Sequence, residues 1–119
     1  MAPVLANTLL PAAHTPLLTL RELAMSKPCM IRLPGICCFN AATTVLAHFR
    51  LVQVSGLGLK APDFCGAWAC YKCHEYVDTH KDADTVAAFA HGMVRTQNLI
   101  LKYHKDILIE YLNQLSARV

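Results

Sequence analysis

Cys70 and Cys73 form a Cys-x-x-Cys pair, and His74 follows them directly. Such a pair supplies two thiolates from one tight turn, and zinc in proteins takes four ligands in a tetrahedron. Upstream, Cys29 and Cys37 enclose a Pro-Gly turn signal that can fold the chain back so that both cysteines face one site. We therefore predict a structural zinc ion held by these four cysteines.

Other interpretations of the cysteines stay open. Cys38 follows Cys37 at once and could be the ligand in its place. Cys70 and Cys73 could form a redox pair, but that use is typical of a βαβ context, which this sequence does not show. Buried free thiols are a further alternative, and it is the one that we favour for Cys38 and Cys65.

Two histidines are candidates for catalysis. His74 and Asp78 stand at positions i and i+4, which places both on one face of a helix. With water and a phosphate oxygen, they would suit Mg²⁺ or another divalent cation. His48 stands in an apolar run, and as a neutral imidazole it could take a proton from water as a general base. The plainer alternatives are a surface His–Asp pair and a core histidine.

Short elements must position these side chains. Residues 43–51 predict a strand with His48 near its C-terminal part, and residues 64–69 predict its partner in a short hairpin. A short helix is expected from Tyr71 to near Thr79. A hairpin this small has only marginal stability in water, because it buries little apolar surface. Binding of a zinc ion would supply the missing stability.

The two ends of the chain follow different patterns. Residues 1–18 contain three prolines and little periodicity, which predicts an irregular arm. Thr19 is then the expected N-cap of a short helix. After a capping aspartate, Asp82 or Asp84, apolar residues recur at helical spacing and predict one long helix over about residues 83–116.

Length and composition bound the fold and the compartment. A chain of 119 residues, 55% of them hydrophobic, has room for one core. We expect an α+β domain over residues 19–119, a zinc-stapled hairpin plus helix with a long C-terminal helix. The prolines make residues 1–18 a poor secretory signal, and no apolar run reaches the ~18 residues of a membrane span. We therefore expect a cytoplasmic protein, and in such a reducing compartment paired cysteines more often bind metal.

Basic residues near these motifs are candidates for DNA contacts. A net charge of +3 permits nucleic-acid binding without demanding it. Arg95-Thr96-Gln97 could also face DNA, or else solvent. The Gly56-x-Gly58 stretch predicts a plain turn, since a lone Gly-x-Gly is weak support for phosphate binding. The predicted phosphate contacts are Arg32, Arg50, Lys60 and Lys72.

An apolar stripe runs along the predicted C-terminal helix. Its last part extends past what so small a domain can cover, which predicts a homodimer through this helix. Its members are Val86, Phe89, Met93, Ile100, Ile107, Tyr111 and Leu115.

Five motifs follow one another over about residues 20–100: Cys29-x7-Cys37, Leu46-Ala-His48, Gly56-x-Gly58-x-Lys60, Pro62-Asp63 and Ala69-Cys70-x-x-Cys73-His74. Taken together, they resemble the YbcO-like family of small phage and prophage nucleases, which is similar to nucleases of HNH or ββα-metal type. The resemblance implies a ββα-metal core with His48 as base, His74 and Asp78 as ligands of the catalytic metal, and the four cysteines as zinc ligands. The sequence departs from the wider group at Ala47, where a second histidine is usual. Asp63 is the polar residue nearest to the usual asparagine, and it could orient His48 or help to bind metal.

Our leading hypothesis is a divalent-metal-dependent DNA endonuclease of phage or prophage origin. The alternative is a non-catalytic, zinc-stabilised DNA-binding or recombination accessory protein. A third hypothesis is a structural protein that dimerises through its C-terminal helix.

Overall fold

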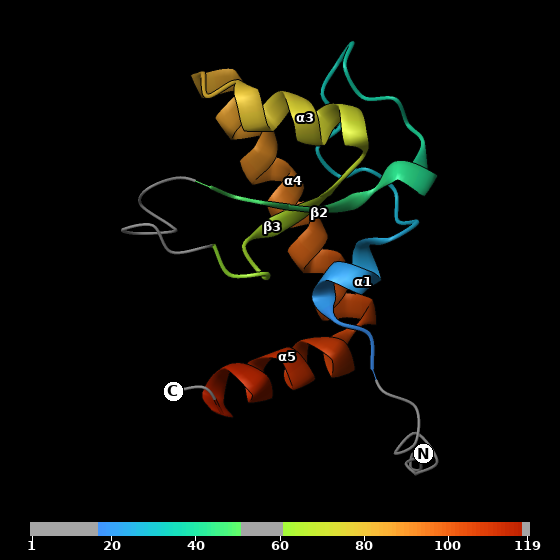
Figure 1. Cartoon of the computed structure of the whole chain (residues 1–119), viewed down its shortest axis with the longest axis vertical. Coiled ribbons are helices and arrows are strands. Elements are labelled where there is room, and N and C mark those ends of the chain that lie inside the picture. Colours follow the sequence, from blue (N-terminus) through green and yellow to red (C-terminus); the bar gives the residue numbers. More distant parts are fainter. Residues whose placement is uncertain (1–16, 51–60, 118–119) are drawn as a thin grey trace.

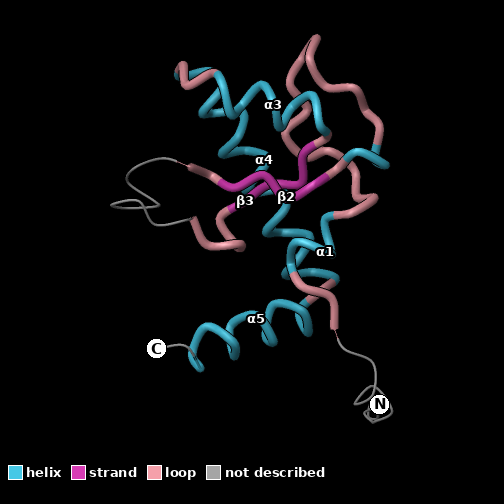
Figure 2. The backbone as a smooth tube through the Cα atoms, in the orientation of Figure 1, coloured by secondary structure: helices cyan, strands magenta, loops and turns pink. Residues whose placement is uncertain are grey.

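A two-stranded antiparallel hairpin stands at the centre of the structure (Figure 1). The computed structural model describes residues 17–50 and 61–117. Strand β2 (Val45–His48) pairs with β3 (Gly66–Ala69), so that Leu46 lies opposite Trp68 and His48 lies opposite Gly66. Helices and loops make up most of the remaining chain (Figure 2). The predicted arm, except for its last two residues, and the predicted turn that carries Lys60 lie outside the described residues.

Side-chain caps start the helices where the sequence predicts them. Thr19 and Glu22 form a capping box at the start of α1 (Leu20–Ala24). Helix α3 (Tyr71–Thr79) begins after Cys70, whose sulfur accepts from the backbone N–H of Cys73. Asp82 accepts from the backbone N–H of Thr85 and starts α4 (Ala83–Tyr103). The first strand, predicted over residues 43–51, is shorter in the structure: a 3-10 turn (Ala41–Thr43) includes its first predicted residue, and β2 ends at His48.

The hairpin separates two hydrophobic cores, because successive side chains of a strand point to opposite faces. Leu46 and Trp68 enter one core, whereas Ala47, Ala67 and Ala69 enter the other. The cysteine-side core consists of Cys29, Ile31, Leu33, Ala47, Ala67, Ala69, Cys70, Cys73, Val77 and Phe89. The tryptophan-side core consists of Leu20, Leu23, Ala24, Met30, Leu46, Trp68, Ile100, Ile107 and Leu108. The α3 helix lies on the first side, and α1 and α5 lie on the second (Figure 1).

Helix α4 crosses behind the hairpin and is tied to it by polar side chains (Figure 1). The buried Thr96 hydroxyl accepts from the backbone N–H of Trp68 at 3.0 Å. Arg95 donates to the carbonyl of Met30 at 2.7 Å, and Gln97 donates to that of Phe64 at 2.8 Å. The suggestion that Arg95, Thr96 and Gln97 face DNA or solvent is therefore wrong, since all three satisfy polar groups within the fold.

Gly92 is the point of closest approach between α4 and the segment before the hairpin. A Cβ at this position would lie 2.9 Å from Ile31 Cγ1 and 3.0 Å from the Met30 carbonyl oxygen. We expect Gly92→Ala to lower the free energy of unfolding by about 1 kcal/mol, because overpacking costs about 1–3 kcal/mol and alanine returns about 1 kcal/mol of helix propensity. Urea denaturation measures the change.

The exposed Ala87 on the same helix supplies the control for that substitution. Ala87→Gly should show the helix-propensity effect alone, about 1 kcal/mol of destabilisation. A Gly92→Ala protein more stable than the wild type would contradict close packing at Gly92.

The C-terminal helix is interrupted, contrary to the sequence prediction of one helix over residues 83–116. His104 leaves the helical conformation with φ −137° and ψ 39°, and α5 (Lys105–Ala117) sets off in a new direction (Figure 1). The break brings Ile107 and Leu108 back into the tryptophan-side core, where both are buried. A continuous helix would carry these two side chains away from α1, so apolar burial accounts for the interruption.

The outer part of α5 keeps exposed apolar side chains. Ile109, Leu112 and Leu115 are 57%, 48% and 37% exposed. The homodimer predicted through this helix is compatible with that surface and stays a prediction.

Candidate functional site

Four cysteines form a cluster with the geometry of a metal site. The sulfur atoms of Cys29, Cys37, Cys70 and Cys73 all lie within 4.8 Å of one another, and the Cys37 and Cys70 sulfurs are 3.8 Å apart. Zn–S bonds of ~2.3 Å in a tetrahedron place neighbouring sulfurs about 3.8 Å apart. The cluster can therefore hold a metal ion such as zinc. Within residues 17–50 and 61–117, no other group of three or more Cys, His, Asp or Glu ligands has such spacing.

Backbone N–H groups support two of these sulfurs. The N–H of Arg32 donates to Cys29 Sγ and the N–H of Cys73 donates to Cys70 Sγ, each at 3.5 Å. Arg32 adopts a left-handed backbone conformation, with φ +55°, which a non-glycine residue takes up at some cost. Its guanidinium also donates to the Cys29 carbonyl at 3.2 Å. Arg32, predicted as a phosphate contact, thus also holds the first cysteine turn in shape.

The four clustered thiols can all lose their protons only if a cation lies between them. Burial raises the pKa of Cys37 to about 11, and burial likewise raises the pKa of Cys73. Burial also opposes ionisation of Cys29 and Cys70, but hydrogen bonds from backbone N–H groups outweigh it and lower the pKa of both thiols. The main donor is the N–H of Arg32 for Cys29 and the N–H of Cys73 for Cys70. Four thiolates at this separation repel one another strongly unless a cation lies between them. Metal binding at this cluster would therefore release protons.

The other cysteines stand outside the cluster. Cys37, not Cys38, faces the other three ligands, and the Cys38 sulfur lies 3.8 Å from the Thr43 hydroxyl. Cys65 is half-buried and does not join the four. All six cysteines are free thiols. The choice between Cys37 and Cys38, left open by the sequence, is thus made by the turn geometry.

His48, at the end of β2, is joined to Asp63. Its Nε2 lies 2.7 Å from Asp63 Oδ1, and the histidine side chain is only 12% exposed. Burial opposes ionisation of Asp63, but hydrogen bonds from His48 and Arg21 outweigh it and lower the pKa of the carboxyl group. An ionised carboxylate can only accept, so Nε2 of a neutral His48 carries the hydrogen and Nδ1 carries the free electron pair.

His74 and Asp78 meet on α3 as their spacing predicts. His74 Nε2 lies 3.3 Å from Asp78 Oδ2, and both side chains are partly exposed. The structure thus pairs His48 with Asp63 and His74 with Asp78. Neither pair joins a larger group of metal-ligating atoms in the part of the chain that the structure describes.

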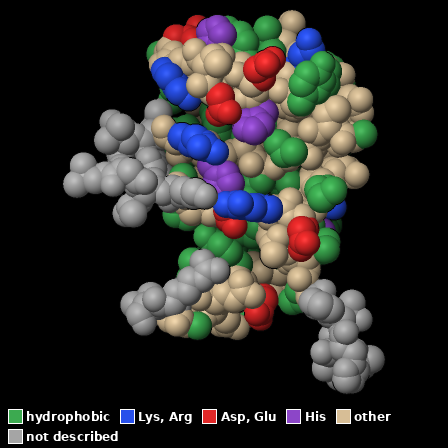
Figure 3. All heavy atoms as spheres, viewed as in Figure 1, with side chains coloured by type: hydrophobic (Ala, Val, Ile, Leu, Met, Phe, Trp, Pro, Cys, Tyr) green, Lys and Arg blue, Asp and Glu red, His purple; other side chains and the backbone are tan. Residues whose placement is uncertain are grey.

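The remaining basic candidates lie on the surface. Arg50 is exposed just after β2, and Lys72 lies over the ring of Tyr71 with its ammonium 5.5 Å from the centroid. Lys60 lies outside the described residues. Figure 3 shows histidine, basic and acidic side chains gathered on one face of the molecule. Arg21, which sequence analysis missed, reaches Asp63 from α1 at 3.2 Å. Nothing in its local sequence marks that contact, which spans 42 residues.

A protein-family model described as "Putative nuclease YbcO" matches residues 18–105 of the chain. The chain belongs to the YbcO family. "Putative nuclease YbcO" of Escherichia coli K12 is 44% identical over 87 residues, which cover 70% of this chain and 91% of that relative. "Putative nuclease ybcO" of Enterobacteria phage 82 matches with the same identity and coverage. The predicted family membership is therefore confirmed.

A solved structure shares the fold of this chain over the region that it matches. It is described as a putative bacteriophage protein from Escherichia coli K-12 MG1655, and it is 36% identical with a TM-score of 0.56. The match covers 69% of this chain and 95% of the other chain. The family match ends at residue 105, where α5 begins. Among the helices of the described part of the chain, none is long and apolar enough to cross a membrane.

Proposed function

We propose that this YbcO-family chain is a divalent-metal-dependent DNA endonuclease of HNH type. The observation that carries the proposal is the 2.7 Å contact between His48 and Asp63 at the end of the hairpin. The contact defines the tautomer of the imidazole, so that Nδ1 is the nitrogen left to accept a proton, which is what general-base catalysis requires. The order of β2, β3 and α3 and the names of the relatives support the same conclusion.

His48 is the base of the proposed reaction. Its Nδ1 takes a proton from a water molecule, and the water oxygen forms a bond to phosphorus. The bond from phosphorus to the leaving ester oxygen breaks, and the ester oxygen leaves with the electron pair of that bond. Asp63 stabilises the imidazolium that forms and keeps the ring in the correct tautomer, as the carboxylate does in a Ser-His-Asp triad.

His74 and Asp78 are the proposed ligands of the catalytic cation. An imidazole and a carboxylate on one helix face supply two donor atoms, and phosphate oxygens and water would complete the coordination of a divalent cation. Such a cation would neutralise negative charge that develops on the phosphate.

The four-cysteine cluster is the proposed structural zinc site. It joins the turn at Cys29–Cys37 to the start of α3, and α3 carries His74. Zinc would therefore fix the position of the helix that holds the second metal.

Cleavage of supercoiled plasmid DNA by the purified chain tests the proposed activity. We expect nicked product with Mg²⁺ or Mn²⁺ and none without an added divalent cation. DNA binding without cleavage under every divalent cation would overturn the nuclease. That outcome would favour a zinc-stabilised DNA-binding or recombination accessory protein, an alternative supported by the observation that the His74–Asp78 pair has no third protein ligand among the described residues.

Asp63→Asn tests the contact between Asp63 and His48. An amide can donate to Nε2 and so favour the wrong tautomer, and it does not stabilise the imidazolium. We expect the cleavage rate constant at saturating DNA to fall by on the order of 10²–10⁴-fold. Single-turnover cleavage measures this.

Asp84→Asn, an exposed substitution in the first turn of α4, is the matched control and should cleave like the wild type. An Asp63→Asn protein with wild-type single-turnover cleavage would show that Asp63 does not act through His48.

A further inference from the structure

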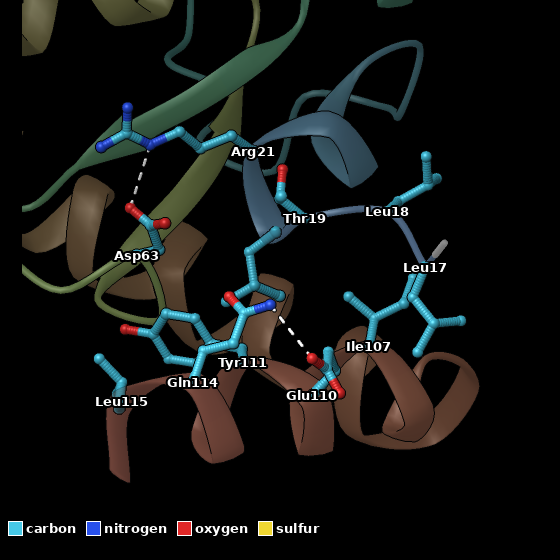
Figure 4. A pocket seen from close by; sticks show the side chains of 11 residues that line it. Leu17, Leu18, Thr19, Arg21, Asp63, Ile107, Glu110, Tyr111, Gln114 and Leu115 are labelled. Carbon is cyan, nitrogen blue, oxygen red and sulfur yellow. Dashed lines mark hydrogen bonds and ion pairs between the residues drawn. The ribbon is translucent and has the colours of Figure 1, made fainter. Parts of the chain in front are cut away.

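Arg21 and His48 share one carboxylate oxygen. Arg21 Nε lies 3.2 Å from Asp63 Oδ1, and His48 Nε2 lies 2.7 Å from the same atom. Figure 4 shows Arg21 reaching from α1 to Asp63, with Tyr111 and Gln114 of α5 on the other side of that carboxylate. The guanidinium is therefore held close to the candidate base through Asp63.

The described residues leave the outer edge of this guanidinium without a hydrogen-bond partner. A guanidinium carries five N–H donors, and the contact with Asp63 uses one of them. The terminal nitrogens point away from the carboxylate in Figure 4, and they make no hydrogen bond with any residue that the structure describes. The side chain is 59% exposed. Arg32 and Arg95 differ, because a terminal nitrogen of each donates within the fold, to Met30 Sδ and to the Met30 carbonyl respectively.

The contact between Arg21 and Asp63 does little for the stability of the fold. Exposed ion pairs of this kind contribute little, since solvent screens them and two side chains lose freedom. What the contact does fix is the place and direction of a planar cation. Two parallel N–H groups of a guanidinium match two phosphate oxygens, and Arg is enriched at phosphate sites for that reason.

We propose that Arg21 binds a DNA backbone phosphate beside His48, with Asp63 orienting both side chains. The proposal rests on the DNA endonuclease function proposed above and adds a substrate-binding residue to it. The Asp63 carboxylate would then orient two side chains: the mostly buried His48, which is the proposed base, and the exposed Arg21, which would bind the phosphate.

The salt dependence of DNA binding tests this role. The full chain is titrated with a fluorescently labelled DNA duplex at several salt concentrations, without added Mg²⁺ or Mn²⁺. Because one phosphate contact releases about one counterion, the slope of log affinity against log salt should be shallower by about 0.9 in Arg21→Gln. At low salt the affinity should fall by about tenfold or more.

Two further variants make the result specific to position and charge. Arg21→Lys keeps the charge and should keep most of the slope. Lys105→Gln removes an exposed charge from the start of α5 and should leave the slope unchanged. All three variants should melt within about 1 °C of the wild type if the ion pair has no structural role.

The possible results distinguish a failure of the Arg21 phosphate contact from a failure of the proposed nuclease function. An unchanged slope in Arg21→Gln would overturn the phosphate contact, even if cleavage falls, because Arg21 would then only support His48 through Asp63. Absence of wild-type DNA binding at low salt would overturn it as well. A wild-type protein that binds DNA but never cleaves would refute the nuclease, whereas a shallower slope in Arg21→Gln would still establish the contact.

Discussion

Removing metal from the four-cysteine cluster is expected to unfold the protein. Cys70 and Cys73 are completely buried at the start of α3, and the cluster joins them to Cys29 and Cys37 across the cysteine-side core. Binding of a structural zinc ion contributes about 10–16 kcal/mol in zinc-finger peptides, and whole domains are stable by only about 5–15 kcal/mol. Cys73→Ser should therefore lose the metal and its cooperative thermal transition.

Metal analysis and circular dichroism measure both effects. The wild type should carry about one zinc ion per chain, and a strong chelator should abolish its folded signal. Cys65→Ser is the matched control, because Cys65 lies outside the cluster, and it should keep both the metal and the transition. A metal-free wild-type protein with an unchanged melting temperature would contradict the structural role of zinc.

His48→Ala is expected to abolish DNA cleavage while the fold remains. A positioned general base contributes about 10²–10⁴-fold to the rate. The loss should appear in the rate constant at saturating DNA, whereas DNA affinity should stay near that of the wild type, because Arg21 and Asp63 still form their contact.

The exposed His91 on α4 offers a control of the same residue type. His91→Ala should cleave plasmid DNA at the wild-type rate. If His48→Ala cleaves as fast as His91→Ala, then His48 is not the base, and the activity belongs elsewhere in the preparation or the chain.

The features that sequence predicted correctly depend on residues close together in the chain. Thr19 and Asp82 cap their helices through backbone groups within a few residues. The helix from Tyr71 to Thr79 has the bounds that were expected. The cysteine cluster spans distant segments, yet the ligand chemistry of zinc was enough to predict Cys29, Cys70 and Cys73, with Cys37 preferred to Cys38.

The features that sequence missed depend on the packing of whole elements. Arg21 and Asp63 are 42 residues apart and meet only because α1 lies against the hairpin. No proline or glycine stands near His104, so the interruption between α4 and α5 has no local signal and follows from the burial of Ile107 and Leu108. Arg95 belongs to an otherwise regular helical pattern, and its role as a donor to Met30 exists only in the folded chain.

The hairpin has no open face, and this restricts how any ligand can approach it. All four residues of β3 are buried, and so are Leu46 and Ala47 of β2. Only Val45 and His48, at opposite ends of β2, have side chains in reach of solvent. A long molecule such as DNA therefore cannot lie across the sheet. The two ends of β2 remain accessible, and of these one carries the aliphatic Val45 and the other carries His48.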